Sequence, residues 1–440
     1  MAATRGAFVQ IGATRDGLDP YLRCARRRGM TAVLVETPAY LRWRRLLRRQ
    51  PFDLELPVPG LDDTGQVADA LRAAEVEPAL VLAGFERYVP TAFRFAAAAR
   101  VAPWPYVGRH FVPLDKVQQR AALRRHAPTV LQPGYAQVPT GAVGTDAKGS
   151  NGPGPDGPGL PTGLSFPQVV KPADGAGGLG VSLVRNEAER AIALRDAAAT
   201  GNYGGGAFSG LLVEEHISGT EYSLQGLAWN GRARILTCCE KLVLLERSGA
   251  LRGFREAGHL AAPGPATPPA LKALAQAGVT ATGYEEGPFH IDVIENDQGP
   301  FFIEMGFRLS GFGLVALVTR VSGLSWAEHA FAAHLERKAP VASPNGGRRR
   351  LAAGQLLATD PGQLARAGRL AAEQAYQARV RVEASPPVPG PDGFTERELA
   401  CLASDRQRHA TILGRVTIEH DDPAWVRDRL LYCAGNVPGG

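Results

Sequence analysis

The sequence predicts a mixed α/β fold, and three observations carry this prediction. Short apolar strands alternate with helix-like segments through the first 112 residues, which is the pattern of a parallel sheet covered by helices. From about residue 166 to residue 304, strand-like segments dominate instead. The chain has 440 residues, which is too long for one ordinary core, so two or three domains are expected.

Composition indicates a soluble globular protein. Hydrophobic residues make up 45% of the chain and charged residues 21%, which is normal for a soluble enzyme. No apolar run is long enough to span a bilayer and the N-terminus lacks a signal-peptide pattern, so we expect no membrane association and a cytoplasmic location. The five cysteines form no C-x-x-C pair, so neither a disulfide framework nor a zinc site is expected.

The basic residues are almost all arginine. Arginine-rich stretches at 23–28 and 42–49 fit solvated helix faces, and no aromatic-interleaved basic motif accompanies them or the stretch at 348–350, so we expect no nucleic-acid partner. Only six lysines stand against 43 arginines. This ratio indicates a general drift toward arginine in place of lysine. A lysine that is retained nevertheless marks a site that needs a compact ammonium group, although Lys148, in a polar linker, is an incidental exception.

The first part of the chain is expected to be a small α/β domain that ends near residue 112. Glycines at both ends of the turn 12–17 are a weak phosphate-loop signal, and a tight strand-to-helix turn is the plainer interpretation. The segments that predict this domain are strands at 7–11, 32–36 and 79–83 and helices at 18–29 and 65–74.

The middle of the chain contains a segment that is not expected to order itself. Residues 141–163 are rich in Gly, Pro and Ser and nearly free of large apolar side chains, so they predict a flexible loop. Helices are predicted at 115–127 and 186–199. Beyond about residue 345, two further segments follow on either side of the turn-rich stretch 385–393, and neither carries a recognisable motif.

A glycine-rich stretch follows Lys171. Gly175, Gly177 and Gly180 have the G-x-G-x-x-G spacing, but residues 181–184 read as a second strand and not as a helix. The loop is therefore predicted to join two antiparallel strands, with backbone N–H groups that can close over phosphates and Lys171 beside them. A hairpin that binds nothing is the alternative.

A second hairpin is predicted to bring two carboxylates together. Period-two alternation places His290 and Asp292 on one face of a strand, 296–299 forms a turn, and the returning strand carries Glu304. Adjacent carboxylates repel unless they are neutralised, as Mg²⁺ does with one or two carboxylates and substrate phosphates. The alternative is a surface pair balanced by Arg308.

Taken in chain order, these features resemble the ATP-grasp superfamily over roughly residues 113–330. The resemblance implies an ATP-grasp fold, with an ATP-grasp domain at 113–340 that includes a small subdomain at about 164–210. A Rossmann-like α/β domain at 1–112 would precede it, and 341–440 would form a C-terminal extension that completes the lid and core. The ordered set is Asp115-Lys116, Lys171 with its glycine loop, Glu214 to Glu221, and Asp292 with Glu304-x-x-x-Arg308.

The resemblance also implies the cofactors and their residues. ATP and two Mg²⁺ ions are expected, with Mn²⁺ as an alternative metal. Gly306 stands where many members have asparagine as a further metal ligand. The implied contacts are Lys116, Lys171, Gly177 and Gly178 with the phosphates, Glu214 and the backbone through Ile217 with adenine, Glu221 with ribose, and Asp292 and Glu304 with metal, Glu304 bridging the two ions.

A narrower resemblance, to the L-amino-acid (dipeptide) ligase branch, is carried by "FREAGHLAAPG" at 254–264 and "EMGFRLSGFG" at 304–313. It implies that Glu256 and His259 contact the first amino acid, although a structural role for His259 remains the alternative. Arg308 would bind substrate carboxylate or acyl-phosphate oxygens and stabilise the developing oxyanion, Phe312 would wall the side-chain pocket, and Lys241 would be a third cation on the transferring phosphate.

These resemblances predict an ADP-forming ligase that joins a carboxylate and an amine, both amino-acid-like, through an acyl phosphate. Homodimers are common among similar proteins, so a homodimer is an open expectation. Other ATP-grasp chemistry is the first alternative, either a carboxylase-like enzyme or a ligase for a non-amino acid. A nucleotide-binding protein without catalysis is the second.

Overall fold

The computed structural model describes residues 6–16, 18–108, 111–139, 163–203, 205–248, 250–339, 351–374, 378–390 and 392–435. The loop predicted at 141–163 lies outside these described residues, apart from Gly163, and so does Lys148.

The N-terminal region contains a parallel sheet, as the sequence predicts, and this sheet has a fourth strand, β3, beyond the three that the sequence predicts. Its strand order is β3-β2-β1-β4, and all residues of β1 and β2 are buried, which explains their continuous apolar runs. Helices supply the crossovers that parallel strands require. The elements are β1 (Ala7–Ile11), α1 (Pro20–Arg27), β2 (Ala32–Glu36), α2 (Pro38–Leu46), β3 (Leu54–Pro57), α3 (Thr64–Ala73), β4 (Pro78–Ala83), the 3₁₀ turn η1 (Glu86–Tyr88) and α4 (Val89–Ala99).

The second sheet has twelve strands in the described part of the chain, and its paired strands are antiparallel. The main path runs β13-β12-β9-β10-β11-β7-β6-β8-β5, and β14 joins it by pairing with β11. β16 pairs with β14 and β15, so the C-terminal segments extend this sheet. The strands are β5 (Tyr135–Val138), β6 (Gln168–Pro172), β7 (Ser182–Val184), β8 (Leu211–Glu215), β9 (Thr220–Trp229), β10 (Arg232–Ser248), β11 (Leu251–Pro263), β12 (Gly287–Asn296), β13 (Gly299–Gly306), β14 (Ala352–Ala358), β15 (Arg379–Ala384) and β16 (Gly414–His420).

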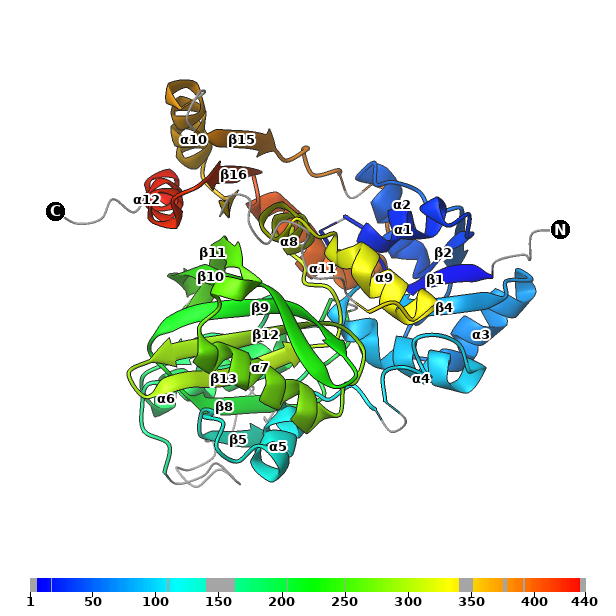
Figure 1. Cartoon of the computed structure of the whole chain (residues 1–440), viewed down its shortest axis with the longest axis horizontal. Coiled ribbons are helices and arrows are strands. Elements are labelled where there is room, and N and C mark those ends of the chain that lie inside the picture. The colour runs from blue at the N-terminus through cyan, green and yellow to red at the C-terminus, as the bar shows by residue number, and fades with distance from the viewer. Residues whose placement is uncertain are drawn as a thin grey trace.

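Helices cover the large sheet and connect it to the N-terminal region (Figure 1). α7 lies against β12 and β13, where Gly278 permits close approach to Ile291 and Phe302. α9 lies between α1 and β12, and Trp326 donates to the Gly226 carbonyl at 2.9 Å. The helices are α5 (Lys116–His126), α6 (Glu187–Ala199), α7 (Pro269–Thr282), α8 (Leu314–Ser322), α9 (Trp326–Glu336), α10 (Pro361–Glu373), α11 (Glu396–Thr411) and α12 (Pro423–Ala434).

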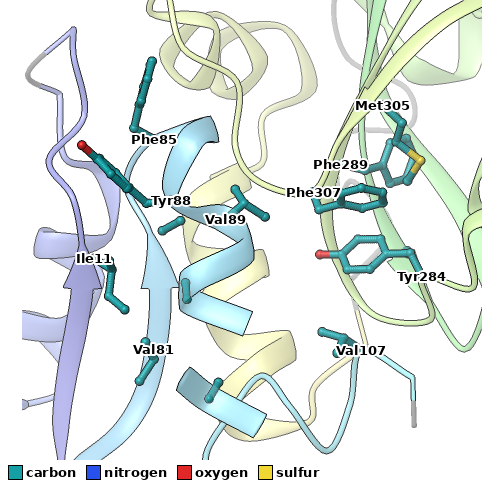
Figure 2. Packing of buried hydrophobic residues seen from close by; sticks show 14 of the residues in the cluster. Ile11, Val81, Phe85, Tyr88, Val89, Val107, Tyr284, Phe289, Met305 and Phe307 are labelled. Atoms are coloured by element: carbon teal, nitrogen blue, oxygen red, sulfur yellow. The ribbon is translucent and has the colours of Figure 1, made fainter. Parts of the chain in front are cut away.

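One hydrophobic cluster joins the two sheets. It contains Ile11 and Val81 of the N-terminal sheet together with Phe289 of β12 and Phe307, which directly follows β13. Figure 2 shows Val89, at the start of α4, between the N-terminal strands and Phe307. Because interiors are packed as densely as organic crystals, this cluster holds the 3₁₀ turn before α4 at a defined place beside β13.

No helix in the described ranges is long and apolar enough to cross a membrane.

Candidate active site

A cavity of about 1050 Å³ opens between the N-terminal region, the large sheet and α11. All three parts of the chain contribute to its wall. Every residue that the sequence predicts for the site lines this cavity, with the exception of His259. The cavity is thus the place where the predicted chemistry must be tested.

The glycine loop closes one side of the cavity. β6 and β7 pair antiparallel on either side of residues 173–181, so strands flank the loop as predicted. Gly177 and Gly178 have φ values of +65° and +75°, a region that disfavours residues with a Cβ. A Cβ on Gly177 would lie 3.1 Å from the Tyr203 hydroxyl. Glycine is therefore favoured at both positions by backbone conformation.

Lys171 leaves β6 beside this loop and is held by a buried carboxylate. Its Nζ lies 2.6 Å from Oε2 of Glu214, while Arg120 donates to Oε1 of the same carboxylate from Nε at 2.9 Å and from Nη2 at 2.6 Å. Burial works to raise the pKa of Glu214, but Lys171 and Arg120 outweigh it and hold that pKa below its usual value. Burial lowers the pKa of Lys171, and the nearby Arg120 adds to this effect.

This arrangement gives the Glu214 side chain a structural role. Its two carboxylate oxygens contact Lys171 and Arg120, so it orients the lysine. The predicted adenine contact is then left to the backbone that follows Glu214, through Ile217. Arg120 was not predicted as a site residue, although it lies one helical turn after Lys116 on α5 and therefore on the same face. Glu221 lines the cavity from β9, and burial raises its pKa.

Lys116 reaches the cavity from the first residue of α5. Asp115 forms the N-cap of this helix in a capping box with Gln118, which satisfies two backbone N–H groups and fixes where the helix begins. Lys116 Nζ lies 2.7 Å from Glu304 Oε2 and donates to the Gly175 carbonyl at 2.6 Å. Burial works to raise the pKa of Glu304, but Lys116 and Lys171 prevail and lower it to about 2.

A third lysine links three further predicted residues. Lys241 on β10 lies 2.5 Å from Asp292 Oδ2 and 3.1 Å from Glu256 Oε2. His259 Nε2 lies 2.7 Å from the other oxygen of Glu256. His259 is only 1% exposed, so the imidazole lies behind Glu256 and not on the cavity wall. This placement favours a role in positioning Glu256 over the direct substrate contact that the sequence predicts.

Asp292 and Glu304 are opposite each other on β12 and β13. Cross-strand partners have their side chains on the same face, so the hairpin brings the two carboxylates together as predicted. Asp292 Oδ1 is buried and has no hydrogen-bond partner among the described residues. An orphaned carboxylate oxygen beside a second carboxylate fits a divalent cation, since Mg²⁺ takes few protein ligands and completes its shell with water and phosphate.

The same hairpin explains Gly306. A Cβ at this position would lie 2.1 Å from Cε1 of His290, its partner across the strands. An asparagine therefore has no room here, and no group of three or more His, Cys, Asp or Glu side chains arranged for a metal occurs in the described ranges. For a metal held by Asp292 and Glu304, substrate and water are the expected further ligands.

Another part of the cavity wall is built from distant parts of the chain. Arg308 follows β13, and its Nε lies 2.7 Å from Oε2 of Glu86 in the N-terminal region. Phe312 has φ of +57°, a costly conformation for a residue with a side chain. Gln355 of β14 donates to its carbonyl at 2.8 Å, which helps to hold Phe312 at the cavity wall. The sequence contains no local signal for Glu86, because its partner lies in another region of the chain.

Comparison with known proteins agrees with this geometry. Residues 164–315 match the model of the ATP-grasp domain. Over 269 residues, 57% of this chain, the sequence is 28% identical to carnosine synthase 1 of Gallus gallus, and the match spans 27% of that protein's length.

Solved structures share the whole architecture. An L-amino acid ligase from Bacillus licheniformis has a TM-score of 0.66 and 18% identity, with 98% of each chain covered. Biotin carboxylase from Campylobacter jejuni has a TM-score of 0.60 and 14% identity, with 99% of this chain and 92% of that chain covered. The protein therefore has the ATP-grasp fold, and its central segment is an ATP-grasp domain.

Proposed function

We propose that this protein is an ATP-dependent ligase that joins a carboxylate to an amine and releases ADP and phosphate. The single observation that carries the proposal is the grouping of three lysine–carboxylate pairs, Lys116–Glu304, Lys171–Glu214 and Lys241–Asp292, on one cavity wall under a glycine hairpin. Compact cations and carboxylates in this arrangement suit a nucleotide triphosphate with its metal.

The proposed reaction has two steps. The γ-phosphoryl group leaves the β-phosphate oxygen of ATP and bonds to a carboxylate oxygen of the acid, which gives an acyl phosphate and ADP. The amine nitrogen then bonds to the acyl carbon while the bond from that carbon to the phosphate oxygen breaks. The amine loses one proton, for which the leaving phosphate is the proposed acceptor. The products are an amide, ADP and phosphate.

The chain's residues serve these steps by position and charge. Lys116 and Lys171 bind phosphate oxygens at the base of the glycine loop, and Lys241 binds the transferring group near Asp292. Asp292 and Glu304 hold Mg²⁺, which when bound neutralises phosphate charge. Arg308 stabilises the oxyanion that forms when the amine attacks. The glycine loop covers the site and limits hydrolysis of the acyl phosphate by water.

An amino acid is the proposed acid substrate. The Glu256 carboxylate lines the cavity from β11, which β9 and β10 separate from Asp292 on β12, and it suits a substrate ammonium group. Lys241 and His259 overcome the effect of burial and lower the pKa of Glu256, so it is a carboxylate at neutral pH. The names of two similar proteins, an L-amino acid ligase and a carnosine synthase, support the same substrate class.

The test is ADP release measured with a panel of amino-acid pairs, with mass spectrometry to detect the amide. ADP formation that depends on both partners and yields a new amide supports the proposal. Dependence on bicarbonate would instead support carboxylase-like chemistry, the alternative that the shared fold with biotin carboxylase favours. ATP binding without turnover for any mixture would indicate a non-catalytic nucleotide-binding protein.

A further inference from the structure

Arg408 differs from the other arginines of the cavity. Six arginines line it, and five of them donate to, or form an ion pair with, a protein oxygen. For Arg408, the described part of the chain supplies no ion pair and no side-chain hydrogen bond. Its Cζ lies 4.5 Å from the centroid of the Phe312 ring, and its charge acts on the nearby Tyr203 and Arg415. The five partnered arginines and their partners are Arg15 with Glu36, Arg87 with Asp62, Arg94 with Thr91, Arg255 with Glu246 and Arg308 with Glu86.

The position of Arg408 is imposed by the docking of α11. Asp405 lies three residues before Arg408 on this helix and is 2% exposed. Its carboxylate accepts hydrogen bonds from Trp43 Nε1 at 2.7 Å and from Tyr40 Oη at 3.3 Å, both on α2. These contacts set the rotation of the helix. Residues three and four apart share a face of a helix, so Ser404, Arg408 and Thr411 lie along the cavity wall.

Stacking leaves the guanidinium ready for an anion. A guanidinium that lies over an aromatic ring keeps its N–H donors at its edge, in the fork that matches a carboxylate. Arg408 is half-buried, so those donors remain accessible from the cavity. Two other arginines of the wall are already paired, Arg308 with Glu86 and Arg15 with Glu36. Arg415 of β16 is a further nearby cation, but it is not part of the cavity lining, and the charges of Asp16 and Glu383 act on it.

A series of contacts leads from Glu256 to Arg408 and indicates which part of a substrate Arg408 contacts. Glu256, the proposed partner of the substrate ammonium, touches His259. Behind the wall, the His259 ring lies 6.4 Å from the Phe312 ring, and Arg408 stacks on Phe312. Glu256, Phe312 and Arg408 all line the cavity, so a side chain that extends along Phe312 from an amino acid held by Glu256 would approach Arg408.

We infer that Arg408 binds a carboxylate on the side chain of the acid substrate, so that this substrate is a dicarboxylic amino acid. The inference rests on the proposed function for the orientation of the substrate. The other source of a carboxylate is the α-carboxylate of the amine substrate. We assign that group to Arg308, which also lines the cavity.

The experiment compares glutamate with glutamine, and aspartate with asparagine, as acid substrates at fixed amine. We expect the wild-type protein to prefer the acidic member by at least about tenfold in kcat/KM, because charge-assisted bidentate pairs are strong. Arg408→Gln should remove most of this preference, mainly through KM, and Arg408→Lys should retain part of it. Arg397→Gln, an exposed position on the same helix, should leave it unchanged.

A binding measurement separates this inference from the proposed function. Thermal shift with glutamate or glutamine needs no turnover. Stabilisation by glutamate that is lost in Arg408→Gln supports the inference even if no amide forms, while amide formation without any acid-over-amide preference overturns it and leaves the ligase intact. If Arg408→Gln instead discriminates less between glycine and glycinamide as amine, the side-chain assignment is wrong. Should Arg408→Gln not fold, Arg408→Lys provides the same comparison.

Discussion

The two ends of the cavity are built in different ways. At one end, where we propose that the nucleotide binds and which we call the nucleotide end, Lys116, Lys171 and Lys241 each contact a carboxylate on a strand of the large sheet. At the other end, which we call the outer end, the cations are arginines. Arg308 pairs with a residue of the N-terminal region, and Arg408 comes from the C-terminal α11. One end is defined by strand register and the other by the docking of three separate parts of the chain.

The difference assigns different tasks to the two ends. Three of the six lysines of the chain lie at the nucleotide end, where a compact ammonium can move from a carboxylate to a phosphate oxygen. The planar fork of arginine instead suits recognition of a carboxylate with defined geometry. We expect changes at the nucleotide end to affect ATP chemistry or folding, and changes at the outer end to affect the choice of substrate.

The largest effect is expected for Glu304→Gln. Loss of one of two facing carboxylates removes a metal ligand, and metal neutralisation is worth several kcal/mol, so ADP formation should fall by about a thousandfold or more. The melting temperature should fall less than that of Glu214→Gln, because the Glu304 side chain is more exposed than that of Glu214. Glu295→Gln, on the same hairpin but outside the cavity wall, should keep normal turnover. Near-normal ADP release by Glu304→Gln would show that Asp292 and Glu304 hold no metal.

Glu214→Gln should act on folding more than on chemistry. It leaves buried Lys171 and Arg120 without a compensating charge, which costs about 3 kcal/mol of unfolding free energy. Urea denaturation of this variant beside Glu215→Gln, an exposed neighbour, measures the difference. An equal stability for both variants would mean that Glu214 is dispensable for holding Lys171.

Glu86→Gln is the corresponding test at the outer end. Without the Glu86 carboxylate, Arg308 loses its orientation, and we expect KM for the substrates to rise by about tenfold with a smaller change in kcat. Steady-state kinetics compare it with Asp62→Asn, which removes the partner of Arg87 at a more exposed ion pair. A larger effect from Asp62→Asn would contradict the role given to Arg308 and Glu86.

The smallest effect concerns His334, which lies on α9 at neither end of the cavity. Burial lowers its pKa to about 3, so between pH 6.5 and 3 the unfolded chain binds a proton that the folded protein does not. The free energy of unfolding should therefore decrease as pH falls through this window, by at most about 1.4 kcal/mol per pH unit from this group. His334→Leu should flatten that part of the stability profile, whereas exposed His126→Gln should not.

Much of the nucleotide end could be predicted from the sequence. The glycine spacing followed by a strand predicted the hairpin at Lys171, and period-two alternation around a turn placed Asp292 opposite Glu304. The scarcity of lysine pointed to Lys116, Lys171 and Lys241. Arg120 was missed even though its helical spacing from Lys116 was a usable signal, because nothing local shows that Glu214 needs a second cation.

What the sequence by itself determined is the local geometry: strands, turns, caps and the pairing of near neighbours, all of which depend on a few consecutive residues. Only the tertiary structure decided which distant groups meet, as with Arg308 and Glu86 or Phe312 and Arg408. It also showed His259 behind Glu256 and His290 in the space beside Gly306. The physical reason is that these contacts depend on how the hydrophobic cores hold the N-terminal region, the large sheet and α11 together, and packing of this kind is a property of the whole chain.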